Sequence, residues 1–146
     1  MRRLTTPITL VAAALTVAGG AIHLREWLHT YRHVPSAVPG SFVVKVGFPI
    51  NAVTSVVIAV ALVYAGVWAR HLLPFALAAA AGFEAASLAS LILSRVGDVL
   101  GWRETAWTPG AEQTRAVEIG ALVAIALVAL LLVRIRRTPT VALATA

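Results

Sequence analysis

The chain has 146 residues, of which 60% are hydrophobic and 12% are charged, and its formal net charge is +6. Charged residues make up about 25% of an ordinary soluble domain, so this composition excludes a soluble globular protein and indicates that lipid covers much of the surface. The basic residues stand mostly singly at the ends of apolar runs, which indicates membrane topology and excludes a nucleic-acid-binding face. The sequence has no cysteine, which excludes disulfides, iron–sulfur clusters, thiolate zinc sites and thiol redox catalysis.

The first apolar run covers residues 4–24 and carries no formal charge. Arg2 and Arg3 precede it, as basic residues precede a secretory signal peptide, but the run is long for such a segment and no Ala-x-Ala motif ends it. We therefore predict a retained membrane-spanning helix over about residues 6–27.

The second and third apolar runs predict a helical hairpin. The second, residues 46–69, is uncharged, and its helix begins either near Ser41 or at Pro49, because about 20 residues are enough to span the hydrocarbon core. The third predicted span starts around Pro74 and covers about residues 72–95. Only Arg70 and His71 separate the two runs, so the chain turns back between them and the helices are antiparallel.

The fourth helix has clear start and stop signals. Thr108 suits the N-cap and Pro109 suits the first helical position, while basic residues at 134, 136 and 137 precede Pro139. The apolar stretch begins after Glu118, so we expect the first turns to stand above the lipid and the span to cover about residues 113–135.

These runs predict one all-α domain, residues 1–146, that forms a transmembrane four-helix bundle with antiparallel, up-down-up-down helices. Loops 28–45 and 96–112 then lie outside and both termini lie in the cytoplasm. Each side carries six of the twelve basic residues, but the cytoplasmic six are in shorter segments that contain no acidic residue. We expect a multi-pass protein of a bacterial plasma membrane. The outer aromatic residues should form an interfacial belt: Trp27, Tyr31, Trp102 and Trp107.

Glu84 lies near the middle of the third span, where an ionised carboxylate costs at least a few kcal/mol. It is either a protonated or paired side chain that fixes helix packing, or a carboxylate that handles protons or binds a ligand. In both cases we expect Glu84 to face protein. Arg95 lies eleven residues further on, roughly 16 Å along the helix axis, which is too far for an ion pair.

His23 lies near the outer end of the first span. Thr16, Gly19 and Gly20 share its side at helical spacing, and small residues allow a neighbouring helix to come close, so His23 should face the bundle. We expect its side chain within direct or water-bridged hydrogen-bond reach of Asn51 or Glu118. A single histidine in such a place is more often a hydrogen-bonded packing residue than a metal or haem ligand.

An outward-facing polar pocket is predicted where the outer helix ends and the two long loops converge, and Arg95 is among the polar residues at this end. We expect Arg103 and Glu104 to fold back over the mouth of the bundle. The alternative is a plugged bundle in which the charges only pair with one another. Together with Glu84, the candidate ligand-binding residues are His23, Lys45, Asn51, Arg103, Glu104, Arg115 and Glu118.

His29 and His33 have i,i+4 spacing and could ligate a metal if their segment is helical. The sequence has no His-Glu-x-x-His motif, and interfacial packing is the favoured interpretation. It also has no P-loop, dinucleotide fingerprint or nucleophile elbow. We predict no cofactor, with haem or quinone at His23 as the alternative.

Short motifs spread over the whole chain resemble those of a family of small four-helix membrane proteins common in actinobacteria. They are Ala21-Ile22-His23-Leu24, Tyr31-Arg32-His33-Val34-Pro35, Gly101-Trp102-Arg103-Glu104 and Glu118-Ile119-Gly120. That family has no established activity. The resemblance implies the fold and a place in a plasma membrane, and implies nothing about mechanism.

The favoured function is that of a non-enzymatic binding or accessory subunit in the lipid bilayer, beside other membrane subunits or a second copy. One alternative is a redox subunit that binds haem or quinone through His23, with His29 or His33 as a further candidate. Another is a small proton-coupled transporter centred on Glu84, which would need to dimerise because one four-helix unit is small for alternating access.

Overall fold

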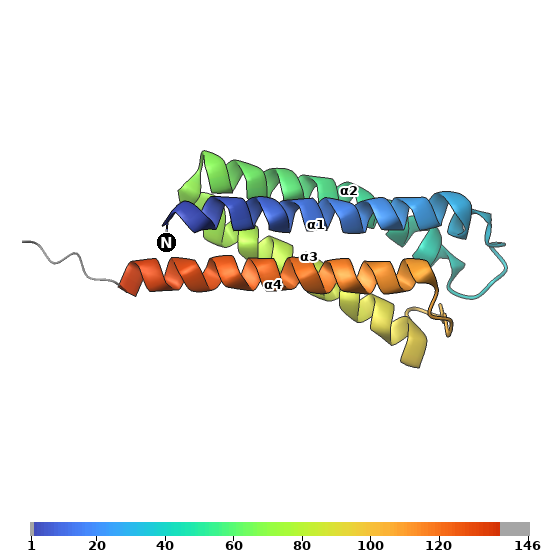
Figure 1. Cartoon of the computed structure of the whole chain (residues 1–146). Helices are drawn as coiled ribbons and strands as arrows, with labels where there is room; N and C mark the ends of the chain where they lie inside the picture. The colour runs from blue at the N-terminus through green and yellow to red at the C-terminus, as the bar shows by residue number, and fades with distance from the viewer. Residues whose placement is uncertain (1, 138–146) are drawn as a thin grey trace, which may run out of the picture.

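The computed structural model of the chain describes residues 2–137, without the side chains of residues 2, 3, 136 and 137. Four long helices pack together and confirm the all-α prediction: α1 (Arg2–His29), α2 (Ser41–Val67), α3 (Leu73–Val96) and α4 (Pro109–Arg137). Two short 3-10 helices, η1 (Tyr31–His33) and η2 (Arg70–Leu72), lie in the connections. Consecutive long helices run in opposite directions along the bundle (Figure 1). Pro139, the predicted stop signal, lies outside the described residues.

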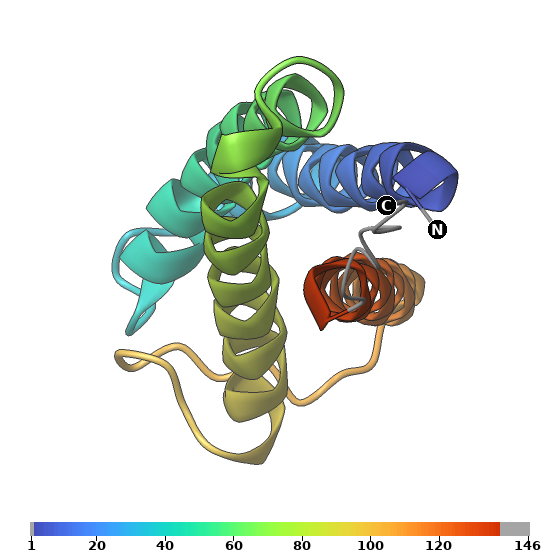
Figure 2. The same cartoon turned by 90° about the vertical axis from the view of Figure 1, so that its left-hand side faces the viewer.

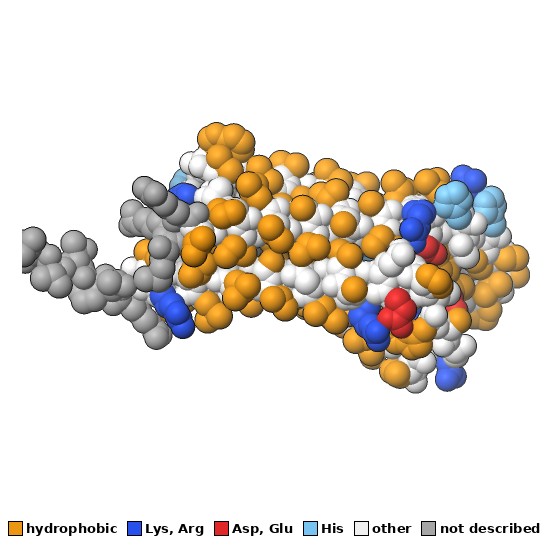
Figure 3. Space-filling view, viewed as in Figure 1, with side chains coloured by type: hydrophobic (Ala, Val, Ile, Leu, Met, Phe, Trp, Pro, Cys, Tyr) orange, Lys and Arg blue, Asp and Glu red, His pale blue; other side chains and the backbone are white. Residues whose placement is uncertain are grey.

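Each of the four long helices is long and apolar enough to cross a membrane. By length and composition, the candidate spans within the described chain are Leu4–His33, Ser41–Val67, Arg70–Val96 and Pro109–Ile135. Hydrophobic side chains cover the flank of the bundle, whereas charged and histidine side chains gather toward its two ends (Figure 3). This distribution suits a bundle whose middle is surrounded by lipid.

The helix boundaries follow from local sequence. Thr108 caps α4 as predicted, because its Oγ1 accepts a hydrogen bond of 3.2 Å from Ala111 N, and Pro109 is the first helical residue. Of the two possible starts of α2, the structure has the earlier one. The helix begins at Ser41, directly after Gly40, and Pro49 lies inside it.

Small residues let α1 lie close to α2. Gly20 is so near to Ser55 that a β-carbon at position 20 would overlap the Ser55 side chain, and a β-carbon at Gly66 of α2 would lie in tight contact with Thr9, 3.0 Å from its Cγ2. The apolar core between the helices consists mainly of alanine and leucine, and Leu62 at its centre is 0% exposed. α1 also packs along α4, whereas α3 crosses the bundle obliquely (Figures 1 and 2).

Both long connections, residues 30–40 and 97–108, lie at one end of the bundle, which we call the long-loop end (Figure 1). Val99 and Trp102 exchange backbone hydrogen bonds of 2.8 and 2.9 Å around a tight turn. Its two central residues, Leu100 and Gly101, have φ of 51° and 86°. A β-carbon on Gly40 would overlap the backbone of Trp102, so the two loops pack directly against each other.

Candidate functional site

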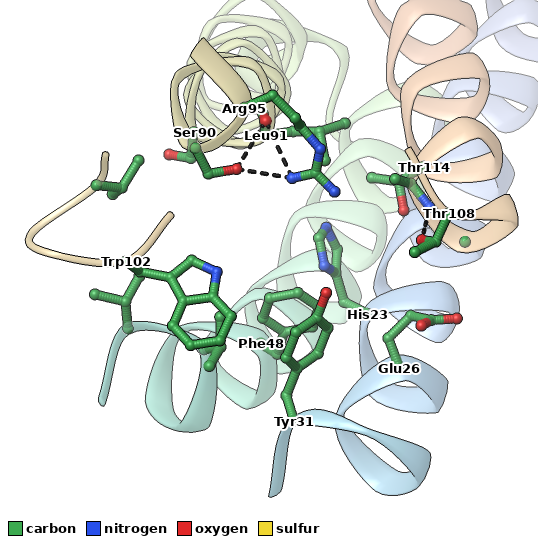
Figure 4. A pocket seen from close by; sticks show the side chains of 16 residues that line it. His23, Glu26, Tyr31, Phe48, Ser90, Leu91, Arg95, Trp102, Thr108 and Thr114 are labelled. Atoms are coloured by element: carbon green, nitrogen blue, oxygen red, sulfur yellow. Dashed lines mark hydrogen bonds between the residues drawn. The ribbon is translucent and has the colours of Figure 1, made fainter. Parts of the chain in front are cut away.

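A cavity of about 100 Å³ lies at the long-loop end, between α1, α2, α3 and the start of α4 (Figure 4). Its wall is mostly apolar and includes the aromatic side chains of Tyr31, Phe48 and Trp102. The ring centroid of Tyr31 lies 4.5 Å from that of Phe48 and 5.9 Å from that of Trp102. Residues from η1, α2 and the second long loop therefore form one aromatic side of the cavity.

His23 of α1 lines this cavity and is 9% exposed. Its ring packs edge-on against Phe48 with centroids 4.9 Å apart. Nε2 lies 3.4 Å from Glu118 Oε1, which confirms the predicted proximity of these two residues. The other ring nitrogen, Nδ1, is buried and has no hydrogen-bond partner among the described residues.

The polar contacts behind His23 link side chains from all four long helices. Ser87 donates its single hydroxyl proton to Glu118 Oε1 at 2.5 Å and accepts a hydrogen bond from Asn51 Nδ2 at 2.9 Å. Ser87 Oγ also lies 3.4 Å from His23 Nε2. Because Ser87 gives its proton to Glu118, Ser87 Oγ can only accept toward His23, and a ring protonated at Nε2 suits this contact. Asn51 is connected to His23 through Ser87.

Arg95 of α3 lines the cavity opposite His23 (Figure 4). One terminal nitrogen donates to Ser94 Oγ at 2.7 Å and to Leu91 O at 3.3 Å, and the guanidinium carbon lies 5.2 Å from the ring centroid of Trp107. Its Nε is buried without a hydrogen-bond partner in the described part of the chain. None of the ion pairs found between described residues includes Arg95.

Glu104 and Arg103 point in different directions. Glu104 folds back over the bundle as predicted, since its N donates to Ser94 O at 2.8 Å and its Oε2 accepts from the Tyr31 hydroxyl at 3.3 Å. The prediction for Arg103 is wrong, because its side chain is exposed. Neighbouring side chains of an extended segment point to opposite sides, so an inward Glu104 turns Arg103 outward. Tyr31 is 8% exposed and belongs to the cavity wall, which corrects its assignment to an aromatic belt.

Two other predicted pocket residues lie outside the cavity. Lys45 Nζ donates to Ser36 Oγ at 3.0 Å on the loop side. Arg115 pairs with Glu112 on the surface of α4 and lies 4.9 Å from the ring centroid of Trp107. Both side chains bind neighbours near their own helix ends, so neither lines the cavity.

Glu84 faces protein, as predicted, and is 2% exposed. Its Oε1 accepts a hydrogen bond of 2.6 Å from Thr16 Oγ1, which ties α3 to α1. Glu84 is not part of the cavity wall. Its hydrogen bond to Thr16 is distinct from the hydrogen bonds that join His23, Ser87 and Glu118.

His29 and His33 do not share a helix. α1 ends at His29, and His33 lies in η1, where its Nε2 accepts a hydrogen bond of 2.9 Å from Arg32 Nε. The i,i+4 helical geometry that a metal site would need is therefore not formed. Within residues 2–137, no group of three or more histidine, aspartate or glutamate side chains is placed to hold a metal ion.

Ser87 and Phe48 are the main site residues that the sequence analysis missed. Ser87 had a detectable signal, since Glu84, Ser87 and Ser94 recur at helical spacing and mark one polar face of α3. Phe48 had none, because an aromatic residue in an apolar run gives no sign of facing a cavity.

No family model, curated protein or solved structure matches this chain. The four long apolar helices suggest a small four-helix membrane protein.

Proposed function

We propose that this chain is an integral membrane protein that binds a small ligand in the cavity at the long-loop end. The observation that carries the proposal concerns His23, which lines the cavity, is about nine-tenths buried and has no hydrogen-bond partner at Nδ1 among the described residues. A buried polar atom without a partner costs free energy, and more so in a protein surrounded by lipid. A ligand in the cavity supplies the missing partner.

The dimensions favour a ligand about the size of one ring. The volume of about 100 Å³ is of the same order as the roughly 150 Å³ that accommodates a benzene molecule. Among the described residues, His23 is the one histidine in the cavity wall, so bis-histidine haem ligation lacks a second ligand there. Binding of a small molecule accounts for the site better than binding of haem.

The proposal includes an orientation in which the long-loop end lies outside the cytoplasm. It is supported by the arginines at the opposite end, which stand in short segments without acidic residues. In this orientation the cavity receives its ligand from the outer side of the membrane.

A cavity-filling substitution tests the proposal. Ala111 is 6% exposed and lines the cavity, so Ala111→Phe should fill it, whereas Ala116 is exposed on the same helix and Ala116→Phe should leave it open. Native mass spectrometry of protein extracted in native lipid should reveal a small-molecule adduct on the wild type and on Ala116→Phe, and none on Ala111→Phe. An adduct on all three proteins, or on none, contradicts the proposal.

A further inference from the structure

We infer that the ligand of this cavity is a small apolar carboxylic acid, whose carboxylate binds between Arg95 Nε and His23 Nδ1. The inference rests on the proposed function and names the chemical class of the ligand. It starts from two buried nitrogen atoms that have no partner among the described residues and that belong to two residues lining the same cavity.

Arg95 requires an acceptor, and an anionic one suits it best. A guanidinium stays protonated in proteins, so Nε is always a donor. The other contacts of Arg95 in the described chain are neutral: Ser94 Oγ, Leu91 O and the face of Trp107. Arg95 therefore brings a positive charge to the cavity wall that no described carboxylate pairs with. An anionic ligand balances this charge and accepts from Nε.

His23 can bind a carboxyl group whether its imidazole ring is protonated or neutral. When both ring nitrogens carry protons, Nε2 donates to Glu118 and Nδ1 donates to a carboxylate. When the ring is neutral, Nδ1 is bare and accepts a hydrogen bond from a protonated carboxylic acid. An amide can also donate to a bare Nδ1 and accept from Arg95 Nε, but it brings no charge to balance the guanidinium, so the preference for a carboxylate comes from Arg95.

The acidic residues around the cavity form no ion pair with Arg95 among the described residues. Glu26 pairs with Arg25 and lies against Gly110 at the start of α4, and Glu104 accepts from the Tyr31 hydroxyl. Glu118 binds Ser87 and His23 through Oε1 and does not line the cavity, and its Oε2 is buried without a hydrogen-bond partner among the described residues. The positive charge of Arg95 therefore has no acidic partner among the described residues and can pair with an anionic ligand.

The remaining wall fits an apolar ligand body. Val44 and Phe48 of α2 and Leu91 of α3 line the cavity, and a single ring is of a suitable size. Benzoate is therefore an appropriate probe. Benzamide is its neutral counterpart of nearly the same shape.

Calorimetry or ligand-detected NMR on the full chain in lipid nanodiscs should give an affinity for benzoate about tenfold or more above that for benzamide, as expected for charge-assisted hydrogen bonds. Equal affinities, or no binding of benzoate to the folded wild type, overturn the inference. This comparison needs no variant and so does not depend on the folding of a mutant.

Two arginine variants of equal net charge locate the anion site. Arg95→Gln should weaken benzoate binding about tenfold or more and leave benzamide binding nearly unchanged. Arg115→Gln is the matched control, because Arg115 lies over the same Trp107 ring but outside the cavity. Equal loss in both variants, or no loss in Arg95→Gln, overturns the inference. If Ala111→Phe removes an adduct while benzoate fails to bind, the ligand class is wrong and the proposed function stands.

Discussion

Trp27 of α1 donates an indole hydrogen bond of 2.9 Å to the backbone oxygen of Lys45 in α2, the oxygen that Pro49 leaves without its helical partner. A residue at position 49 with an N–H would donate to the carbonyl four residues earlier, but proline has no N–H. Unpaired backbone groups are costly in a helix that faces lipid, and transmembrane helices tolerate proline where a neighbouring helix satisfies the freed group. The contact accounts for a continuous α2 that begins before Pro49.

A double-mutant cycle tests this contact. Trp27→Phe should lower the free energy of unfolding by about 1–2 kcal/mol, because the Lys45 carbonyl loses its donor. The same change should cost much less when Pro49→Ala is also present, since alanine restores the helical N–H. Unfolding in mixed detergent micelles measures both values. Equal costs in the two backgrounds would show that the indole contributes packing alone.

The contacts of His23 predict its tautomer. Because Ser87 and the Glu118 carboxylate both act as acceptors toward Nε2, that nitrogen should carry a proton. Nitrogen-15 NMR of histidine-labelled protein distinguishes protonated from bare ring nitrogens, and His23→Phe identifies the resonance. A neutral ring protonated only on Nδ1 would instead show that Glu118 is protonated and donates to Nε2.

Much of the fold could be predicted from the sequence, because apolar runs and cap residues are local signals. Thr108 at the start of α4 and the inward direction of His23 both followed from spacing along a helix. The cavity could not be predicted, because it depends on how α3 crosses its neighbours and on how the two loops meet at Gly40. The outward turn of Arg103 is likewise set by the long-range contacts of Glu104.

Gly20 should be essential for the approach of α1 to α2. Gly20→Ala places a methyl group against Ser55 and should destabilise the protein by about 1–3 kcal/mol through overpacking. Gly82→Ala is the matched control, because a β-carbon there has no neighbour within 4 Å and alanine favours the helix. Thermal unfolding in the same detergent compares the two. A Gly20→Ala protein as stable as Gly82→Ala would contradict the close helix contact.

The proposed orientation predicts where reporter domains become active. A reporter that works only outside the cytoplasm should be active after Ala37 or Ala106, which are exposed positions in the two long loops, and inactive after Ala146. These sites avoid Gly40 and Gly110, whose close neighbours leave no room for an insertion. The opposite pattern of activity would show that the protein has the inverse orientation, with the cavity on the cytoplasmic side.

Glu84 should act through its hydrogen bond with Thr16, and three substitutions separate the possible contributions. Glu84→Gln keeps an oxygen that accepts from Thr16 Oγ1, so a folded yield close to the wild type is expected. Thr16→Val removes the donor and should cost about 1 kcal/mol, as interhelical hydrogen bonds in membranes do. Glu84→Lys places an ammonium at a buried position beside the Thr16 hydroxyl, which donates a hydrogen bond to the native carboxyl group. Burying this charge should cost about 3 kcal/mol or more. The yield of folded protein in membranes, measured by fluorescence-detected size exclusion, should therefore decrease in the order Glu84→Gln, Thr16→Val, Glu84→Lys. Wild-type yields of Glu84→Lys would mean that the side chain at position 84 reaches water or lipid headgroups, because a buried lysine without an acceptor has no other way to recover its lost hydration.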